Sequence, residues 1–178
     1  MGPDYVFHPM SAADLPLVRR WLATPEVARW WGQPDEQYAL VHDDLDHPEM
    51  DQFIISLDDR RFGYIQCYAL SSWNQGFGTQ PPKTRGIDQF IGVSDMIGCG
   101  HGSGFILQFV ERLLTSGIPR VVTDPDPDNG RAIRAYAKAG FQKQRIVDTP
   151  EGPALLMIRD PIPRQATIPH AMGRPPII

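Results

Sequence analysis

The sequence has little of what builds disulfide scaffolds, metal sites or membrane anchors. Its two cysteines, Cys67 and Cys99, are too few for a disulfide framework and too far apart for a paired metal-ligand motif, so both are expected to be reduced thiols. No apolar run approaches the roughly 18 residues that a membrane span requires. The first residues lack the basic start and apolar stretch of a secretory signal, and Val6 does not fit the myristoylation pattern. The sequence therefore predicts a soluble, cytoplasmic protein without a membrane partner.

Positive charge is also scarce. The 178 residues include 17 Lys and Arg against 21 Asp and Glu, a formal net charge of -4, and the basic residues form no cluster. Because nucleic-acid phosphates favour a basic face, this balance argues against a nucleic-acid partner and leaves cationic small molecules open. The segment HDDLDH, residues 42–47, has the composition of a metal cluster, but nothing in it fixes a coordination geometry. We predict a solvated polar face there and no metal site.

What is present is the pattern of one α/β domain, residues 1–160, with a mixed sheet. Its length suits a single core. Strands are predicted at 5–8, 52–57, 62–70, 86–93, 119–124, 141–147 and 153–159, and helices at 15–22, 25–31, 105–114 and 129–140, with the polar segment 35–47 left open as a further helix.

Turn and loop signals divide these elements. Residues 58–61 and 149–152 are predicted to turn two hairpins. The stretch 71–84, SSWNQGFGTQPPKT, holds two prolines and two glycines, which exclude a regular element there. From residue 161 to 178 the chain has five prolines and no periodicity, so we predict an extended tail. It is either a disordered end or a strap over a partner subunit.

The stretch IGCGHGSGF, residues 97–105, holds four glycines and leads into a segment of helical apolar spacing. The backbone N–H groups at the start of a helix are unpaired, and together with the helix dipole they form a site for an anion such as a phosphate. Glycine lets the anion approach the backbone, and Ser103 offers a hydroxyl donor. A tight turn without a ligand is the alternative.

Three other families with glycine-rich ligand-binding loops do not fit this loop. The nucleotide P-loop ends in Gly-Lys-Ser/Thr, and the loop has no lysine. The dinucleotide pattern G-x-G-x-x-G has Ser103 at its last position when it starts at Gly98, and Phe105 when it starts at Gly100. DMIGCGHG looks like the first motif of S-adenosylmethionine methyltransferases, but only residues 103–178 follow it, too little chain for that fold.

A fourth family matches in order and spacing. Gly100-His101-Gly102 fits a pyrophosphate loop of the form G-x-G/A, and residues 129–141, NGRAIRAYAKAGF, carry N-x-x-A, then Tyr, then Lys-x-Gly-Phe. The chain thereby resembles the GNAT N-acetyltransferases. The resemblance implies a mostly antiparallel mixed sheet flanked by helices, acetyl-CoA as cosubstrate, and direct attack of a small-molecule primary amine on the thioester. It implies no oligomeric state beyond monomer or homodimer.

Within that family the chain looks most like the aminoglycoside 6'-N-acetyltransferases. The resemblance spans residues 5–159 and rests on WWG at 30–32, EQY at 36–38, GIDQ at 86–89, TDP at 123–125 and TPEGPA at 149–154. It departs at residues 71–85, where those enzymes carry several acidic residues and this chain has only Lys83 and Arg85 as charges. An aminosugar is therefore the first candidate acceptor and a siderophore-precursor amine the second, with a non-catalytic coenzyme A-binding module as the alternative class.

The resemblance also assigns roles to residues. Asp88 would bind the reacting amine and take its proton, and Tyr136 would donate a proton to the coenzyme's sulfur. The coenzyme would contact Ile91, Gly92, Val93, Gly98, Cys99, Gly100, His101, Gly102, Ser103 and Asn129. The acceptor would contact Trp30, Trp31, Tyr38, Gln66, Asp124 and Glu151. The alternatives are local capping by Asp88 and Asn129, and core packing by the aromatic residues.

Overall fold

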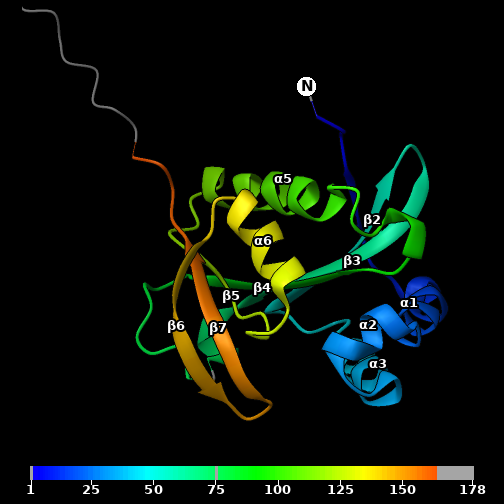
Figure 1. Cartoon of the computed structure of the whole chain (residues 1–178), viewed down its shortest axis with the longest axis horizontal. Helices are drawn as coiled ribbons and strands as arrows, with labels where there is room; N and C mark the ends of the chain where they lie inside the picture. The colour runs from blue at the N-terminus through cyan, green and yellow to red at the C-terminus, as the bar shows by residue number, and fades with distance from the viewer. Residues whose placement is uncertain (1, 75, 164–178) are drawn as a thin grey trace, which may run out of the picture.

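The sheet is the frame of the molecule. A computed structural model describes residues 2–74 and 76–163, where seven strands form one sheet in the order β1-β2-β3-β4-β5-β7-β6 (Figure 1). The strands are β1 (Val6–Pro9), β2 (Met50–Leu57), β3 (Arg60–Ala69), β4 (Arg85–Ile91), β5 (Val121–Thr123), β6 (Gln142–Thr149) and β7 (Gly152–Arg159). Every neighbouring pair is antiparallel except β4 and β5. The predicted fold class is confirmed.

Helices cover both faces of this sheet (Figure 1). They are α1 (Leu15–Leu22), α2 (Pro25–Trp31), α3 (Pro34–Asp43), α4 (Leu70–Trp73), α5 (His101–Thr115) and α6 (Gly130–Lys138), with 3-10 turns η1 (Ala12–Asp14) and η2 (Ser94–Met96). Helices α5 and α6 pack on one face with Tyr5, Phe62 and Ile65, and α1 to α3 pack on the other with Tyr64 and Phe90.

Helix α5 shows why the apolar pattern forms this layer. Phe105, Ile106, Phe109 and Val110 are buried along one stripe, as the helical spacing predicts. Burial of each such side chain stabilises the fold by about 1.5–3 kcal/mol. The stripe therefore fixes the start of α5, and with it the glycine-rich turn, against the sheet.

The parallel pair β4–β5 opens a gap in the sheet. The two strands pair only at Arg85 with Val121 and at Gly86 with Val122. Strand β4 then continues to Ile91 while staying paired with β3, and β5 ends at Thr123. The two strands therefore part toward their C-terminal ends, at the same end of the sheet where the α5 turn follows β4.

The predicted hairpins are confirmed, with one shorter turn. Strands β2 and β3 pair through a two-residue turn in which Asp58 and Asp59 have φ of 48° and 62°. Such left-handed backbone suits a tight hairpin, and Asp tolerates it better than most residues. Strand β3 therefore begins at Arg60, inside the predicted turn 58–61. Strands β6 and β7 pair through the predicted turn at 149–152.

Other predictions need correction. The open segment 35–47 contains helix α3, and the loop prediction for 71–84 is wrong at its start, because α4 occupies Leu70–Trp73 before the first glycine of that loop. Strand β4 ends at Ile91, two residues early, since the chain turns there into η2. Helix α5 begins at His101 and not at residue 105, so two of the four glycines lie in its first turn.

The ends of the chain add little to this frame. Residues 161–163 form no helix or strand, and the rest of the predicted tail lies outside the described residues. Within the described ranges, no helix has the length and apolar character needed to cross a membrane. Both cysteines are free thiols, Cys67 buried and Cys99 exposed, as predicted.

Candidate active site

A cavity of about 420 Å³ lies where α2, α3, β3, β4 and the start of α6 meet. Most of the residues assigned by resemblance to catalysis or to the acceptor line it, although they come from distant parts of the sequence. They are Trp30, Trp31, Gln66, Asp88, Asp124, Tyr136 and Glu151, and Asn129, one of the residues predicted to contact the coenzyme, lines it as well. Tyr38 does not line this cavity. Its ring lies beneath the guanidinium of Arg19, 4.9 Å from it, and beside His42.

Asp88 lies on β4 opposite Gln66 of β3, and Gln66 Nε2 donates a hydrogen bond of 2.9 Å to Asp88 Oδ2. Burial raises the pKa of Asp88 to about 6, and the negative charge of Glu151 adds to the rise, while hydrogen bonds from Gln66 and Tyr68 act against it. A carboxylate in this state is ionised at neutral pH and binds a proton more readily than a surface Asp does. It can serve as a proton acceptor.

The cavity wall is strongly acidic. Carboxylates reach it from the segment after α3, from β4, from the segment after β5 and from the β6–β7 turn: Asp44, Asp88, Asp124, Asp126 and Glu151. Its lining within the described residues includes no Lys, Arg or His. Burial first, and then the charges of Asp88 and Glu151, raise the pKa of Asp124 to about 8. The arrangement favours a ligand with more than one positive charge.

Sequence reasoning missed part of this acidic wall. Asp44 belongs to the segment HDDLDH, which we interpreted as a solvated face, and Asp126 follows the TDP motif. The loop 71–85 has no acidic residue, but these carboxylates supply negative charge from other elements. No periodic signal marks them, since their proximity depends on how the segment after α3 and the segment after β5 pack around the sheet.

Removing one of these charges should stabilise the fold. A raised pKa means that the folded state holds the Asp124 proton more tightly than the unfolded chain, so stability is lost as pH rises from the unfolded value through about 8. Asp124→Asn should therefore raise the thermal midpoint by about 2–4 °C at pH 8.5, the response of a domain of this size to roughly 1 kcal/mol. At pH 4 the gain should be much smaller. If the variant and the wild-type protein had the same thermal midpoint at pH 8.5 as well as at pH 4, this account of the cavity would be contradicted.

Aromatic side chains divide between the cavity and the core. Trp31 lines the cavity and also packs edge-on against Phe90, with ring centroids 4.9 Å apart. Trp30 lies under the guanidinium of Arg29 at 4.8 Å. Trp73, which the sequence did not single out, lines the cavity next to Tyr68. An aromatic ring such as that of Trp31 can thus pack in the core and form part of the cavity wall at the same time.

Tyr136 projects from α6 and is 4% exposed. Its ring packs edge-on against Phe141, and its hydroxyl is placed to hydrogen-bond with Thr123 and Gln89. Burial, reinforced by the charge of Asp88, raises the pKa of Tyr136 well above its usual value. The phenol therefore keeps its proton throughout the physiological pH range and can act there as a hydrogen-bond donor.

Asn129 caps helix α6. Its Oδ1 accepts a hydrogen bond of 3.1 Å from the backbone N–H of Ala132, as the capping alternative predicts. Because Asn129 also lines the cavity, the cap leaves the side-chain NH₂ as a possible donor to a ligand. The cap therefore does not exclude the predicted contact of Asn129 with the coenzyme.

The glycine-rich turn presents an open backbone at the start of α5. Gly98 and Gly100 have φ of 78° and 87°, and among the described residues a Cβ on either would meet no atom within 4 Å apart from those of its chain neighbours. Across the described ranges 2–74 and 76–163, the N–H groups of residues 98–103 have no hydrogen-bond partner. An anion can therefore reach these groups, as the sequence predicts.

The other side chains of the turn are largely engaged. Ser103 Oγ donates to the carbonyl of Gly100 at 3.1 Å, so the hydroxyl expected to face an anion is used within the helix. His101 Nδ1 lies 3.0 Å from the hydroxyl of Tyr5, and a Cβ on Gly104 would lie 2.8 Å from that same hydroxyl. Gly104 thus allows Tyr5 to pack beneath the turn.

The end of β4 leads into this turn. Gly92 donates its N–H to the carbonyl of Phe62 at 2.8 Å, and a Cβ on Gly92 would overlap the ring of Trp21 at 2.1 Å. The glycine is therefore required by the packing of α1. Ile91 and Val93 are partly buried on either side of it. These residues border the gap between β4 and β5, where the resemblance places the coenzyme.

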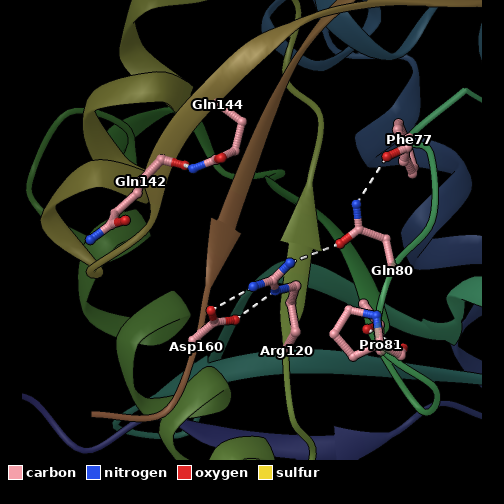
Figure 2. A network of polar contacts seen from close by, with 8 residues as sticks. Phe77, Gln80, Pro81, Arg120, Gln142, Gln144 and Asp160 are labelled. Carbon is pink, nitrogen blue, oxygen red and sulfur yellow. Dashed lines mark hydrogen bonds and ion pairs between the residues drawn. The ribbon is translucent and has the colours of Figure 1, made fainter. Parts of the chain in front are cut away.

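A polar network holds the loop that carries Phe77 (Figure 2). Phe77 lines the cavity, and its carbonyl accepts a hydrogen bond of 2.9 Å from Gln80 Nε2. Gln80 Oε1 accepts one from Arg120, whose guanidinium forms two bonds of 2.6 Å with Asp160. A bidentate pair of this kind has fixed geometry. The loop is thus attached to the start of β5 and to the end of β7.

Comparisons with known proteins agree with this geometry. Residues 11–149 match the family described as "Acetyltransferase (GNAT) domain". The chain is 33% identical over 160 residues to the aminoglycoside N(6')-acetyltransferase type 1 of Klebsiella pneumoniae, covering 84% of this chain and 80% of that protein. It is 43% identical over 79 residues to a kanamycin resistance protein of Rhizobium radiobacter, covering 44% of this chain and 73% of the other.

Solved structures of aminoglycoside acetyltransferases are also similar to this chain. The aminoglycoside acetyltransferase AAC(6')-Ib in complex with coenzyme A superposes with a TM-score of 0.77 at 31% identity, over 88% of this chain and 95% of that one. The complex of the same enzyme with coenzyme A and kanamycin also gives a TM-score of 0.77, at 30% identity and the same coverage of both chains.

Proposed function

We propose, on the premise that this chain belongs to the GNAT family and is an acetyl-CoA-dependent N-acetyltransferase, that its acceptor is a primary amine of a small aminosugar with several positive charges. The acidic cavity wall is the observation that carries this proposal. Burial, together with the charge of neighbouring carboxylates, raises the pKa of Asp88 and of Asp124, so negative charge on this wall is unfavourable until cations neutralise it. An acceptor with several ammonium groups supplies those cations.

Acetyl-CoA is the cosubstrate, and we propose its placement from the open turn and the gap in the sheet. The diphosphate would lie on the N–H groups of residues 99–103, where negative charge also meets the positive end of the α5 dipole. The pantetheine arm would run between β4 and β5, past Ile91, Gly92 and Val93, with Asn129 on the opposite side. The thioester would then reach the cavity that Asp88 and Tyr136 line.

Asp88 would prepare the amine for attack. An amine of pKa near 10.4 is protonated at pH 7. Its pKa lies about 3.4 units above that pH, and at about 1.36 kcal/mol per pKa unit, removing the proton costs roughly 4.6 kcal/mol. The raised pKa of Asp88, about 6, narrows the gap between donor and acceptor compared with an ordinary Asp at 3.8. Asp88 would take the proton, and the neutral amine would attack the thioester carbonyl directly.

Tyr136 would stabilise the departing sulfur. The coenzyme thiol has an ordinary pKa near 8.5, far below that of the buried phenol, so full transfer of the phenol's proton to the thiolate is uphill. The hydroxyl therefore acts mainly as a hydrogen-bond donor to the negative charge that develops on sulfur. This refines the role that the resemblance gives to Tyr136.

The acceptor is tested by measuring release of free thiol from acetyl-CoA with a matched set of amines. We expect turnover with kanamycin and much weaker turnover with a monoamine of similar size, because only the former engages several carboxylates. A preference for hydroxylated diamines of the siderophore-precursor type would favour the second candidate acceptor. Binding of coenzyme A without thiol release from any amine would leave only the non-catalytic alternative.

We propose the cytoplasm as the location, because acetyl-CoA is an intracellular metabolite. Whether the protein is a monomer or a homodimer stays a prediction.

A further inference from the structure

A chain of buried hydrogen bonds connects helix α3 to the carboxylate of Asp88. Gln52 Nε2 donates to the backbone carbonyl of Val41 at 3.1 Å. The hydroxyl of Tyr64 lies 2.6 Å from Gln52 Oε1 and 2.8 Å from Gln66 Oε1. Gln66 Nε2 donates to Asp88 Oδ2 at 2.9 Å. Tyr64 is fully buried and Gln52 is 6% exposed, so the protein itself must satisfy these groups.

This series of hydrogen bonds lacks one donor proton when Asp88 is ionised. The orientation of Gln52 is fixed, because the carbonyl of Val41 has no proton and requires the NH₂ end of the amide. Two amide oxygens therefore face one phenol, which carries a single proton. Whichever amide oxygen receives that proton, the other amide oxygen faces the phenol oxygen without a proton between them. A buried acceptor without a donor is unfavourable.

The shortage disappears if the amide of Gln66 reverses. An amide fills nearly the same volume in either orientation, so reversal needs little extra space. Gln66 Nε2 would then donate to the hydroxyl of Tyr64, whose proton goes to Gln52. Gln66 Oε1 would face Asp88 and would need a proton on that carboxyl group. The structure shows the orientation that suits an ionised Asp88.

We propose that Gln66 is a positioning residue that reverses its side-chain amide when Asp88 gains a proton, and that Gln52 and Tyr64 make the reversed orientation the fully hydrogen-bonded one. The inference rests on the proposed function, in which Asp88 takes a proton from the amine. In that step an N–H bond of the ammonium breaks and an O–H bond forms on Asp88, so the two opposite charges neutralise each other. We call Gln52, Tyr64 and Gln66 the relay. In its reversed orientation, Gln66 Oε1 accepts a hydrogen bond from the new O–H of Asp88.

Other titratable groups also act on Asp88 and Tyr64. Tyr68 of β3 and Glu151 of the β6–β7 turn act on Asp88, and the charge of Asp88 in turn acts on Asp124 and Tyr136. Asp44, after α3, acts on Tyr64. These groups stay in place when the relay is changed, so opposite effects of two relay variants cannot come from them.

Two substitutions should shift the proton affinity of Asp88 in opposite directions. In Gln52→Leu the hydroxyl of Tyr64 is free to donate to Gln66 Oε1. The Gln66 amide is then fully hydrogen-bonded while its NH₂ group donates to an ionised Asp88. The titration midpoint of Asp88 should fall by about 1 pH unit, the scale of one exchanged hydrogen bond. Gln66→Leu removes both the donor to the carboxylate and the acceptor for the carboxyl proton. Because a hydrogen bond to the charged form is the stronger of the two, the midpoint should rise. The midpoint is read from the carboxyl ¹³C shift, assigned by comparison with Asp88→Asn.

The reversal itself has a direct signature. Nuclear Overhauser contacts between the side-chain NH₂ of Gln66 and the ring of Tyr64 should be present below the Asp88 midpoint and lost above it. Unchanged contacts across the titration, or midpoints that move in the same direction in both variants, would overturn the proposal. If Gln52→Leu does not fold, Tyr64→Phe replaces it, with a smaller fall expected. These readouts need no turnover, so they stay separate from a failure of Asp88 as the base.

Discussion

Asp88→Asn is expected to lower kcat/KM for acetyl transfer by about 10²- to 10⁴-fold, the usual contribution of a general base. The amide keeps the shape of the carboxyl group and can still accept from Gln66, but it cannot take the amine's proton. Binding of acetyl-CoA should change little, because Asp88 lies in the cavity proposed for the acceptor and not at the glycine-rich turn. Steady-state kinetics with the best amine of the panel gives the measurement.

The pH profile adds a second readout for the same residue. Asp88 must be ionised to act, so kcat/KM of the wild-type protein should fall as pH drops through about 6. The variant should lose this limb. Asp95→Asn is a suitable control, because Asp95 pairs with Arg60 at an exposed position outside the cavity lining. Equal turnover of Asp88→Asn and wild type would exclude the proposed base.

Tyr136→Phe is expected to lower kcat by about 10- to 100-fold, the effect of losing one hydrogen bond of about 1.5–3 kcal/mol to a charged group. The ring stays packed against Phe141, so the fold and the affinity for coenzyme A should be retained. Since the phenol titrates only at very high pH, the wild-type profile should show no alkaline limb from Tyr136 near neutrality. Single-turnover thiol release measures the chemical step directly.

A matched tyrosine serves as the control for this substitution. Tyr38→Phe also removes one hydroxyl, but its ring packs under Arg19 away from the cavity lining. It should leave kcat unchanged. Equal losses in the two variants would show that the effect is not specific to the sulfur, and an unchanged kcat in Tyr136→Phe would remove Tyr136 from the mechanism.

The sequence predicted most of the fold because its local signals agree with the tertiary structure. The apolar stripe of α5, the two hairpins and the glycine turn each have a short-range pattern that only one arrangement satisfies. The misplaced boundaries lie where tertiary contacts overrule that pattern. Helix α5 begins four residues early, at glycines that an isolated helix would disfavour, since Gly104 makes room for Tyr5.

The candidate site could be predicted only in part. Motif spacing located Asp88, Tyr136 and Asn129, which all line one cavity. The sequence could not place Asp44, because its contribution depends on how α3 packs on the sheet. Nor could it show that Gly92 is needed by Trp21, a contact between residues 71 positions apart that no local pattern records.

The acidic wall also has an evolutionary consequence. Its carboxylates belong to separate segments of the chain, and Asp126 and Glu151 are exposed, so neither is needed to fill the core. If the proposed function holds, a single codon change can therefore alter which cationic compound fits, while strand pairing and the proposed coenzyme site stay intact. Such a scaffold can adapt to new amines through successive point mutations, each with little risk to folding.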